Sequence, residues 1–140
     1  MSRYCGPDRE RLVLELNYEE RRRLAPIVMA ILDDWKLDGE QQLAVLGMPG
    51  DTRPRHLNQY RQGTTPFPQE AELIDRARHI IGIQEALHLI FPRNPLMPGF
   101  WLSNPNNRQF GQAPVNIMLE DGLPGMERVW GHLDCTRNWS

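Results

Sequence analysis

The sequence has few of the residue patterns that mark metal sites, cofactor sites or disulfide frameworks. Its two cysteines, Cys5 and Cys135, lie near opposite ends of the chain and form no CxxC motif. No HExxH motif is present, and His132 with Cys135 would supply only part of the ligand set that a zinc site requires. Neither a GxGxxG motif nor a phosphate-binding loop is present. We therefore expect neither a metal nor a cofactor.

Long apolar runs are also missing. No stretch approaches the roughly 20 apolar residues that a membrane-spanning helix needs. The N-terminal Met-Ser-Arg-Tyr-Cys-Gly lacks the apolar centre of a signal peptide. Cys5 and Cys135 fit free thiols in a reducing compartment, with a bridge between them as the alternative. We expect a cytoplasmic protein without a membrane partner.

What the sequence does have is the composition of a globular protein. Of its 140 residues, 40% are hydrophobic and 24% are charged, and the net charge is -2. This length suits one compact domain, or two small ones that share a core. The total charge gives no reason to expect nucleic-acid binding. Residues 51–63, however, contain Arg53, Arg55 and Arg61 and only one acidic residue, Asp51. A local basic patch of this kind is typical of DNA-binding surfaces.

Helical patterns dominate the first half of the chain. Asn17 and Glu20 have the spacing of a capping box, and apolar residues then recur at helical intervals. This pattern predicts a helix over residues 18–36. Asp38 is the next expected N-cap, and Gly47 is the expected end of a short helix.

The inner side of that short helix is expected to carry Leu43, Ala44 and Leu46. A third helix is expected to start from a cap at Asp51 or Thr52 and to end near Gly63. Pro54 falls in its first turn, where a missing N–H costs little.

The second half contains the most apolar helix, which is predicted over residues 69–91 and is expected to be buried around much of its circumference. Residues 64–68 hold two prolines and are expected to form a semi-rigid linker. Shorter helices are predicted over residues 95–102, 113–121 and 125–133. Residues 11–16 alternate in part, but no convincing pair of strands is present. The predicted fold class is therefore all-α.

Residues 37–63 have the layout of a helix-turn-helix, with a short helix, a turn containing glycine and a second, basic helix. Arginine can bond guanine, and asparagine or glutamine can pair with adenine, in the major groove. The candidate DNA-binding residues are Arg53, Arg55, His56, Asn58, Gln59 and Arg61. We assign the first three to base edges or flanking phosphates and the last three to phosphate or solvent. The alternative interpretation is a solvated polar helix in a bundle.

Residues 100–119 run from aromatic side chains into turn residues and then into another apolar segment. Asn104 and Pro105 are typical of a turn, Gly111 permits unusual backbone angles, and Pro114 suits the first turn of a helix. The stretch therefore predicts a corner between two helices. No nucleophile in it has a matched base nearby in sequence, so we expect no enzymatic activity.

A larger set of residues carries a resemblance to a known family. In the C-terminal half it consists of Ile81-Gly82-Ile83, Ala86-Leu87, Phe91, Trp101-Leu102, Asn104-Pro105-Asn106, Gly111, Pro114, the run from Met118 to Met126, Val129 and Leu133. The N-terminal half matches more loosely, through residues 43–48 and the basic helix. With these residues in order and at the expected spacing, the sequence resembles the Xre/MbcA/ParS antitoxin family.

The resemblance implies an antitoxin with two parts. An N-terminal Xre-like helix-turn-helix bundle, residues 1–63, would bind the promoter of its own operon. A small helical C-terminal domain, residues 64–140, would bind and neutralise a toxin carrying a RES domain. Toxins of this type look like ADP-ribosyl transferases and act on NAD. The resemblance also implies at least a homodimer within the toxin–antitoxin complex.

In this family the C-terminal portion of the antitoxin lies at the entrance of the toxin's active site. Tryptophan and arginine are the residue types that dominate interface energetics. The expected toxin-binding residues are Arg137, Asn138 and Trp139. Trp101 is a further candidate, and the alternative interpretation is that it is a core residue.

The main alternative is a helix-turn-helix transcription regulator whose C-terminal domain only dimerises or binds another partner. A neighbouring reading frame for a RES-domain toxin would favour the antitoxin. An enzyme is the third alternative, and NAD turnover by the purified protein would favour it. Because acidic and basic residues balance over residues 1–63, we expect DNA binding to be modest or to require the toxin complex.

Overall fold

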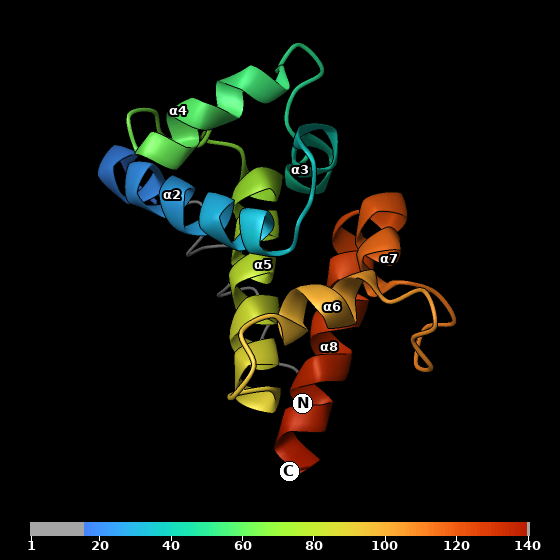
Figure 1. The fold of residues 1–140 in the computed structure, drawn as a ribbon. Coiled ribbons are helices and arrows are strands. Elements are labelled where there is room, and N and C mark those ends of the chain that lie inside the picture. Colours follow the sequence, from blue (N-terminus) through green and yellow to red (C-terminus); the bar gives the residue numbers. More distant parts are fainter. Residues whose placement is uncertain (1–15, 140) are drawn as a thin grey trace.

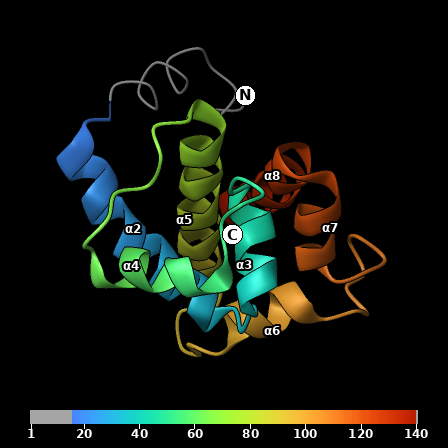
Figure 2. The same ribbon diagram turned by 90° about the horizontal axis from the view of Figure 1, so that it is seen from above.

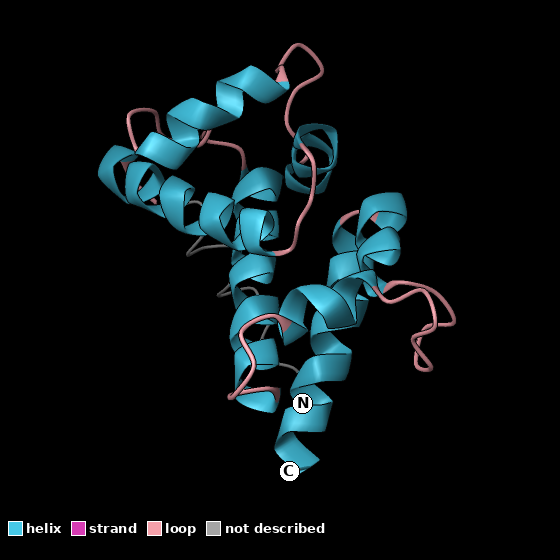
Figure 3. Ribbon diagram, in the orientation of Figure 1, coloured by secondary structure: helices cyan, strands magenta, loops and turns pink. Residues whose placement is uncertain are grey.

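A computed structural model describes residues 16–139, and describes their side chains as far as Asp134. Over these residues the chain is helical and has no strand (Figure 3). The helices are α2 (Tyr18–Asp34), α3 (Gly39–Leu46), the 3-10 helix η2 (Pro54–His56), α4 (Leu57–Gln62), α5 (Ala71–Ile90), α6 (Met97–Ser103), α7 (Pro114–Asp121) and α8 (Leu123–Trp139). The all-α prediction is confirmed for this part of the chain. The partly alternating stretch 11–16 lies, except for Leu16, outside the described residues.

Helix α5 is the centre of the fold. It packs against α8 on one side and against α2 on the other (Figures 1 and 2). The indole N–H of Trp35, at the end of α2, donates a 2.7 Å hydrogen bond to Gln84 Oε1 in the buried face of α5. Because α5 contacts both the N-terminal and the C-terminal helices, the two predicted domains share a core. No helix in residues 16–139 has the length and apolarity that crossing a membrane requires.

The first two helices begin where the sequence predicts, but α2 ends at Asp34, before the predicted Lys36, because the chain leaves the helical conformation at Lys36, which has φ 62°. Asn17 and Glu20 form a capping box at α2, and Asp38 and Gln41 form one at α3. Gly47 ends α3 in the left-handed region, at φ 68°, which glycine adopts without the strain that a Cβ would cause.

The predicted inner face of α3 is partly wrong. Ala44 is exposed, whereas Gln42 is buried. The Nε2 of Gln42 donates to Asp33 Oδ1 at 2.8 Å and to the Leu37 carbonyl at 3.1 Å. These bonds turn α3 so that a polar side chain takes an inner position, because a buried amide is stable only where its hydrogen bonds are made.

Residues 63–67, which follow α4, pack against α2 and α4. Phe67 is completely buried and packs on Tyr60, with ring centroids 5.1 Å apart. Arg21 donates to the Phe67 carbonyl at 2.8 Å, and Arg22 donates to the Gly63 carbonyl at 2.7 Å. Two arginines of α2 thus satisfy backbone groups of a stretch that has no helix of its own.

The C-terminal helices approach one another closely at glycines. Gly125 lies against the backbone of Ile117, so that a Cβ built there would come within 2.9 Å of its carbonyl carbon. The last helix begins at Leu123, earlier than predicted. Gly122, at φ 65°, turns the chain at once, and Pro124 is tolerated because it falls in the first turn of α8.

Candidate functional site

The outer side of α4 carries most of the residues predicted to bind DNA. Leu57 and Tyr60 are buried, and α4 packs against α2, so the opposite side of the helix faces solvent. The exposed residues of this face are Arg53, Arg55, Asn58, Gln59 and Gln62. Gln62 was missed by the sequence prediction, although its helical spacing from Arg55 and Gln59 is a usable signal. We call these five residues the α4 face.

Arg53 and Arg55 are the cations of the α4 face. Both are exposed, and within the described part of the chain neither side chain makes a hydrogen bond or an ion pair. Their guanidinium donors are therefore available to an external acceptor. A phosphate oxygen or the edge of guanine has the charge and geometry that a guanidinium binds best.

His56 has a structural role in the same turn. Its Nδ1 accepts the backbone N–H of Arg53 at 2.9 Å, which closes the first turn of η2. The predicted cap at Asp51 or Thr52 is therefore wrong, because the helical segment starts at Pro54 after Arg53. The contact of His56 with DNA stays a prediction, and only Nε2 would be available for it.

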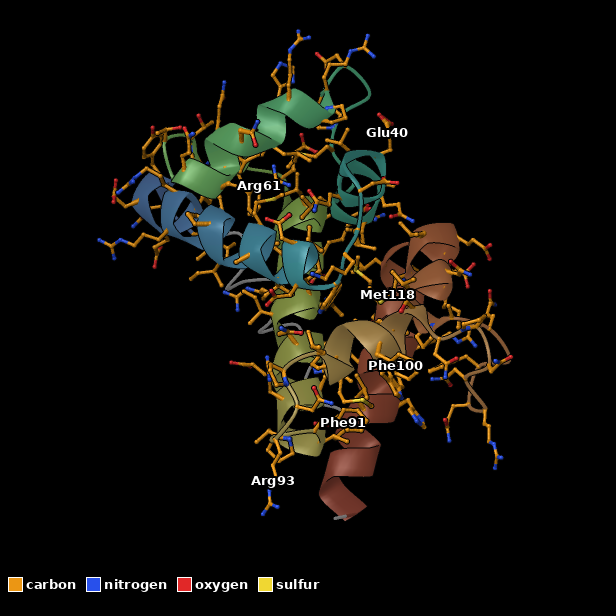
Figure 4. The ribbon with its side chains drawn as sticks, viewed as in Figure 1. Glu40, Arg61, Phe91, Arg93, Phe100 and Met118 are labelled. Atoms are coloured by element: carbon orange, nitrogen blue, oxygen red, sulfur yellow. The ribbon has the colours of Figure 1, made fainter. Side chains whose placement is uncertain are left out.

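Arg61 points inward, between α4 and α2 (Figure 4). Its Nε donates to Asp33 Oδ2 at 3.0 Å and its Nη2 to Gln42 Oε1 at 2.6 Å. Its Nη1 donates to Asn58 Oδ1 at 2.9 Å. The hydrogen bond from Arg61 holds the pKa of the Asp33 carboxyl below its usual value. Arg61 thus joins α2, α3 and α4, and its predicted contact with phosphate stays a prediction.

Gln59 and Asn58 are held more loosely. The Oε1 of Gln59 accepts the Thr65 hydroxyl at 3.2 Å, while Asn58 accepts from Arg61. Both residues are exposed, and within the described part of the chain their side-chain N–H groups make no hydrogen bond. Amide N–H groups of this kind can donate to phosphate or to a base edge.

The corner between α6 and α7 is built by local backbone rules, as predicted. The Oδ1 of Asn104 accepts the Asn106 N–H at 3.1 Å, and Gly111 adopts φ 69°. Pro114 occupies the first turn of α7. The loop between α6 and α7 projects from the helical body (Figure 3). Asn107 is buried and its Oδ1 accepts the Gln109 N–H at 3.0 Å.

Trp101 lies half-buried beside this corner. Its ring meets Phe110 at a centroid distance of 6.2 Å and lies nearly parallel to His132 at 6.4 Å. The guanidinium of Arg128 lies 5.9 Å from the Phe110 ring centre. Burial in this cluster lowers the pKa of His132. Trp101 therefore packs on the core and leaves part of its ring accessible, and its contact with a toxin stays a prediction.

Arg137, Asn138 and Trp139 are the other residues predicted to contact a toxin. They fall within α8, which runs to Trp139, but their side chains lie outside those that the structure describes. The backbone of α8 leads them to the end of the molecule opposite α4 (Figure 1). The α4 face and the C-terminal turns of α8 are therefore separate surfaces.

Comparison with known proteins places the chain among relatives. No model of a known protein family matches it. It is 30% identical over 107 residues to the uncharacterized protein y4oB of Sinorhizobium fredii, and the alignment spans 76% of this chain and 78% of that protein. At this identity and coverage, the chain belongs to the same family as y4oB.

Proposed function

We propose that this chain is an antitoxin of the Xre/MbcA/ParS type, which neutralises a RES-domain toxin and represses its own operon. Its C-terminal residues would occupy the active-site entrance of a toxin that acts on NAD. Its α4 face would bind promoter DNA as the second helix of a helix-turn-helix. The antitoxin inhibits by occupying a site, and this role requires no catalytic group of its own.

The observation that carries this proposal concerns the glycines among the residues that resemble the family. The structure places them where a larger side chain would clash or where the backbone has a positive φ. Gly82 lies where a Cβ would overlap the ring of Trp130, and Gly125 lies against the Ile117 backbone. Gly111 and Gly122 both have positive φ. The glycines in the pattern thus fill positions that other residues resist, which supports a shared C-terminal fold and not a chance match of composition.

The separation of the two surfaces supports a double role. The α4 face and the end of α8 lie at opposite ends of the molecule (Figure 1). A protein bound at the end of α8 would leave the α4 face accessible. One chain can then neutralise a toxin and bind DNA at the same time.

Replacing Arg53 and Arg55 together by alanine is expected to weaken promoter binding by roughly tenfold or more, because the two exposed guanidinium groups are lost. Salt titration of a fluorescent promoter fragment measures this effect. Each lost phosphate contact is expected to lower the slope of log K against log salt by about 0.9. Arg108→Ala is the matched control, since Arg108 is exposed in the loop between α6 and α7. Equal affinities for the double variant and the unchanged protein would exclude the α4 face.

Neutralisation is tested by expressing the adjacent reading frame with and without this chain, and following growth and cellular NAD. The full chain is expected to rescue growth, and deletion of residues 134–140 is expected to abolish the rescue. The Arg53→Ala, Arg55→Ala variant should still rescue, which separates the two roles. Rescue that survives the deletion would move the contact onto the helical body. A harmless neighbour, or one that still kills, would favour the transcription regulator instead.

A further inference from the structure

The polar side chains at the start of α4 offer hydrogen-bond donors to solvent and withhold acceptors. Arg53 and Arg55 carry guanidinium groups, which can only donate. Neither side chain makes a hydrogen bond or an ion pair within residues 16–134. Residues 52–69 contain no acidic residue, so this segment supplies no carboxylate acceptor of its own. The neighbouring side chains contain both a donor and an acceptor, and the fold engages their acceptors.

Arg61 fixes the orientation of the Asn58 amide. The Nη1 of Arg61 donates to Asn58 Oδ1 at 2.9 Å. Because a guanidinium has no acceptor, the atom of Asn58 that faces Arg61 must be the carbonyl oxygen. Arg61 is itself held by the two carboxylate oxygens of Asp33, at 3.0 Å each, and by the buried Gln42. The N–H groups of the exposed Asn58 are therefore left for an external acceptor.

His56 and Gln59 are oriented in the same sense. His56 Nδ1 accepts the Arg53 N–H at 2.9 Å, so the imidazole carries its proton on Nε2 and presents a donor. Gln59 Oε1 accepts the Thr65 hydroxyl at 3.2 Å. Gln62 differs, because its amide makes no hydrogen bond within the described residues, but it lies in the last turn of α4. The N-terminal residues of a recognition helix are the ones that contact base edges.

A surface that presents donors alone can distinguish guanine from adenine. In the major groove guanine presents two neighbouring acceptors, N7 and O6, whereas adenine presents the acceptor N7 beside the N6 donor. A protein donor placed against adenine N6 would be left unpaired, which costs free energy. To pair with adenine, Asn58 would need its carbonyl oxygen, which Arg61 already engages. Phosphate oxygens are acceptors as well, but they are the same at every sequence.

We propose that the α4 face recognises guanine in the major groove, with the amide of Asn58 and the Nε2 of His56 as donors beside the two exposed arginines. This inference rests on the proposed binding of promoter DNA by α4. It adds the base that the surface selects, and it does not depend on the toxin.

Base analogues test the proposal without any change to the protein. The promoter fragment of the chain's own gene is amplified with 7-deazaguanine in place of guanine, which removes the N7 acceptor and keeps base pairing. A second fragment carries 7-deazaadenine in place of adenine. The guanine analogue is expected to weaken binding roughly tenfold or more, and the adenine analogue to leave it unchanged. Because N7 carries no charge, the slope of log K against log salt should stay the same.

Protein variants combined with the analogue locate the contact. Arg55→Ala and Asn58→Ala should each weaken binding of the natural fragment several-fold. Each should weaken binding of the 7-deazaguanine fragment less, because the acceptor is already missing there. Arg93→Ala is the matched control, since Arg93 is exposed and lies far from Arg61 (Figure 4). It should bind both fragments as the unchanged protein does.

Equal affinities for the natural and the 7-deazaguanine fragments would overturn the recognition of guanine and leave DNA binding by α4 in place, through phosphates alone. A loss of affinity confined to the 7-deazaadenine fragment would overturn it too. So would losses from Arg55→Ala and Asn58→Ala that are equal on both fragments. A chain that binds neither the promoter nor an unrelated duplex at low salt would overturn the proposed DNA-binding role together with this inference.

Discussion

Gly82→Ala is expected to destabilise the fold by about 2 kcal/mol, although alanine is the better helix former. Gly82 lies in the buried face of α5, and a Cβ there would overlap the ring of Trp130 on α8. That ring is also confined by His79, whose ring meets it edge-on with centroids 4.9 Å apart. The gain in helix propensity, about 1 kcal/mol, is smaller than the cost of separating two packed helices. Urea unfolding followed by circular dichroism measures the change.

The effect of Gly82→Ala on stability is expected to change sign when Trp130 is also replaced. With Trp130→Leu already present, Gly82→Ala no longer meets the indole ring and should stabilise the chain by up to about 1 kcal/mol. Gly50→Ala is the control without a close neighbour, because a Cβ at Gly50 meets nothing within 4 Å. Equal effects of Gly82→Ala in both backgrounds would show that Trp130 does not set the spacing of α5 and α8.

Arg76→Ala is expected to cost about 2–3 kcal/mol of folding free energy, because one largely buried guanidinium serves the ends of two helices. The Arg76 side chain on α5 is 13% exposed and donates to the carbonyls of Ala44 and Val45, at 3.3 Å each, at the C-terminus of α3. It also lies against Gly122, which ends α7, and bonds Glu72 at 2.8 Å. Helix C-termini are the negative ends of helix dipoles, so a cation there is favourable.

A surface arginine provides the comparison. Arg128 is 59% exposed and lies 3.5 Å from Asp121, so Arg128→Ala should cost at most about 1 kcal/mol. Arg76→Lys should recover only part of the loss, since an ammonium group cannot span several acceptors as a guanidinium does. Similar unfolding free energies for Arg76→Ala and Arg128→Ala would refute the stabilising role of Arg76 between the C-terminal ends of α3 and α7.

Local signals in the sequence determined several of the helix ends. Asn17 and Asp38 accept hydrogen bonds from residues within the next turn, and Gly47 and Gly63 end their helices through their own backbone angles. Interactions of this kind depend on a few adjacent residues, so they can be read without knowing the fold. The corner at Asn104 and Gly111 was predictable for the same reason.

The candidate DNA-binding surface was predictable only in part. The pattern of residues 51–63 indicated a basic helix with a polar face, and Arg53 and Arg55 do lie exposed on it. It assigned Arg61 to phosphate or solvent, and no residue near it in the sequence indicated its bonds to other helices. The partners of Arg61 are Asp33 and Gln42, which come from two other helices.

The sequence by itself therefore determined the helical class, the capping residues of α2 and α3 and the corner between α6 and α7. The tertiary structure decided which polar side chains the fold uses and which remain accessible. Arg61 and Gln42 turn inward because α2, α3 and α4 meet there, and Gly82 is required because α8 brings Trp130 against α5. Such contacts join residues far apart in the chain, and their geometry exists only once the helices have packed.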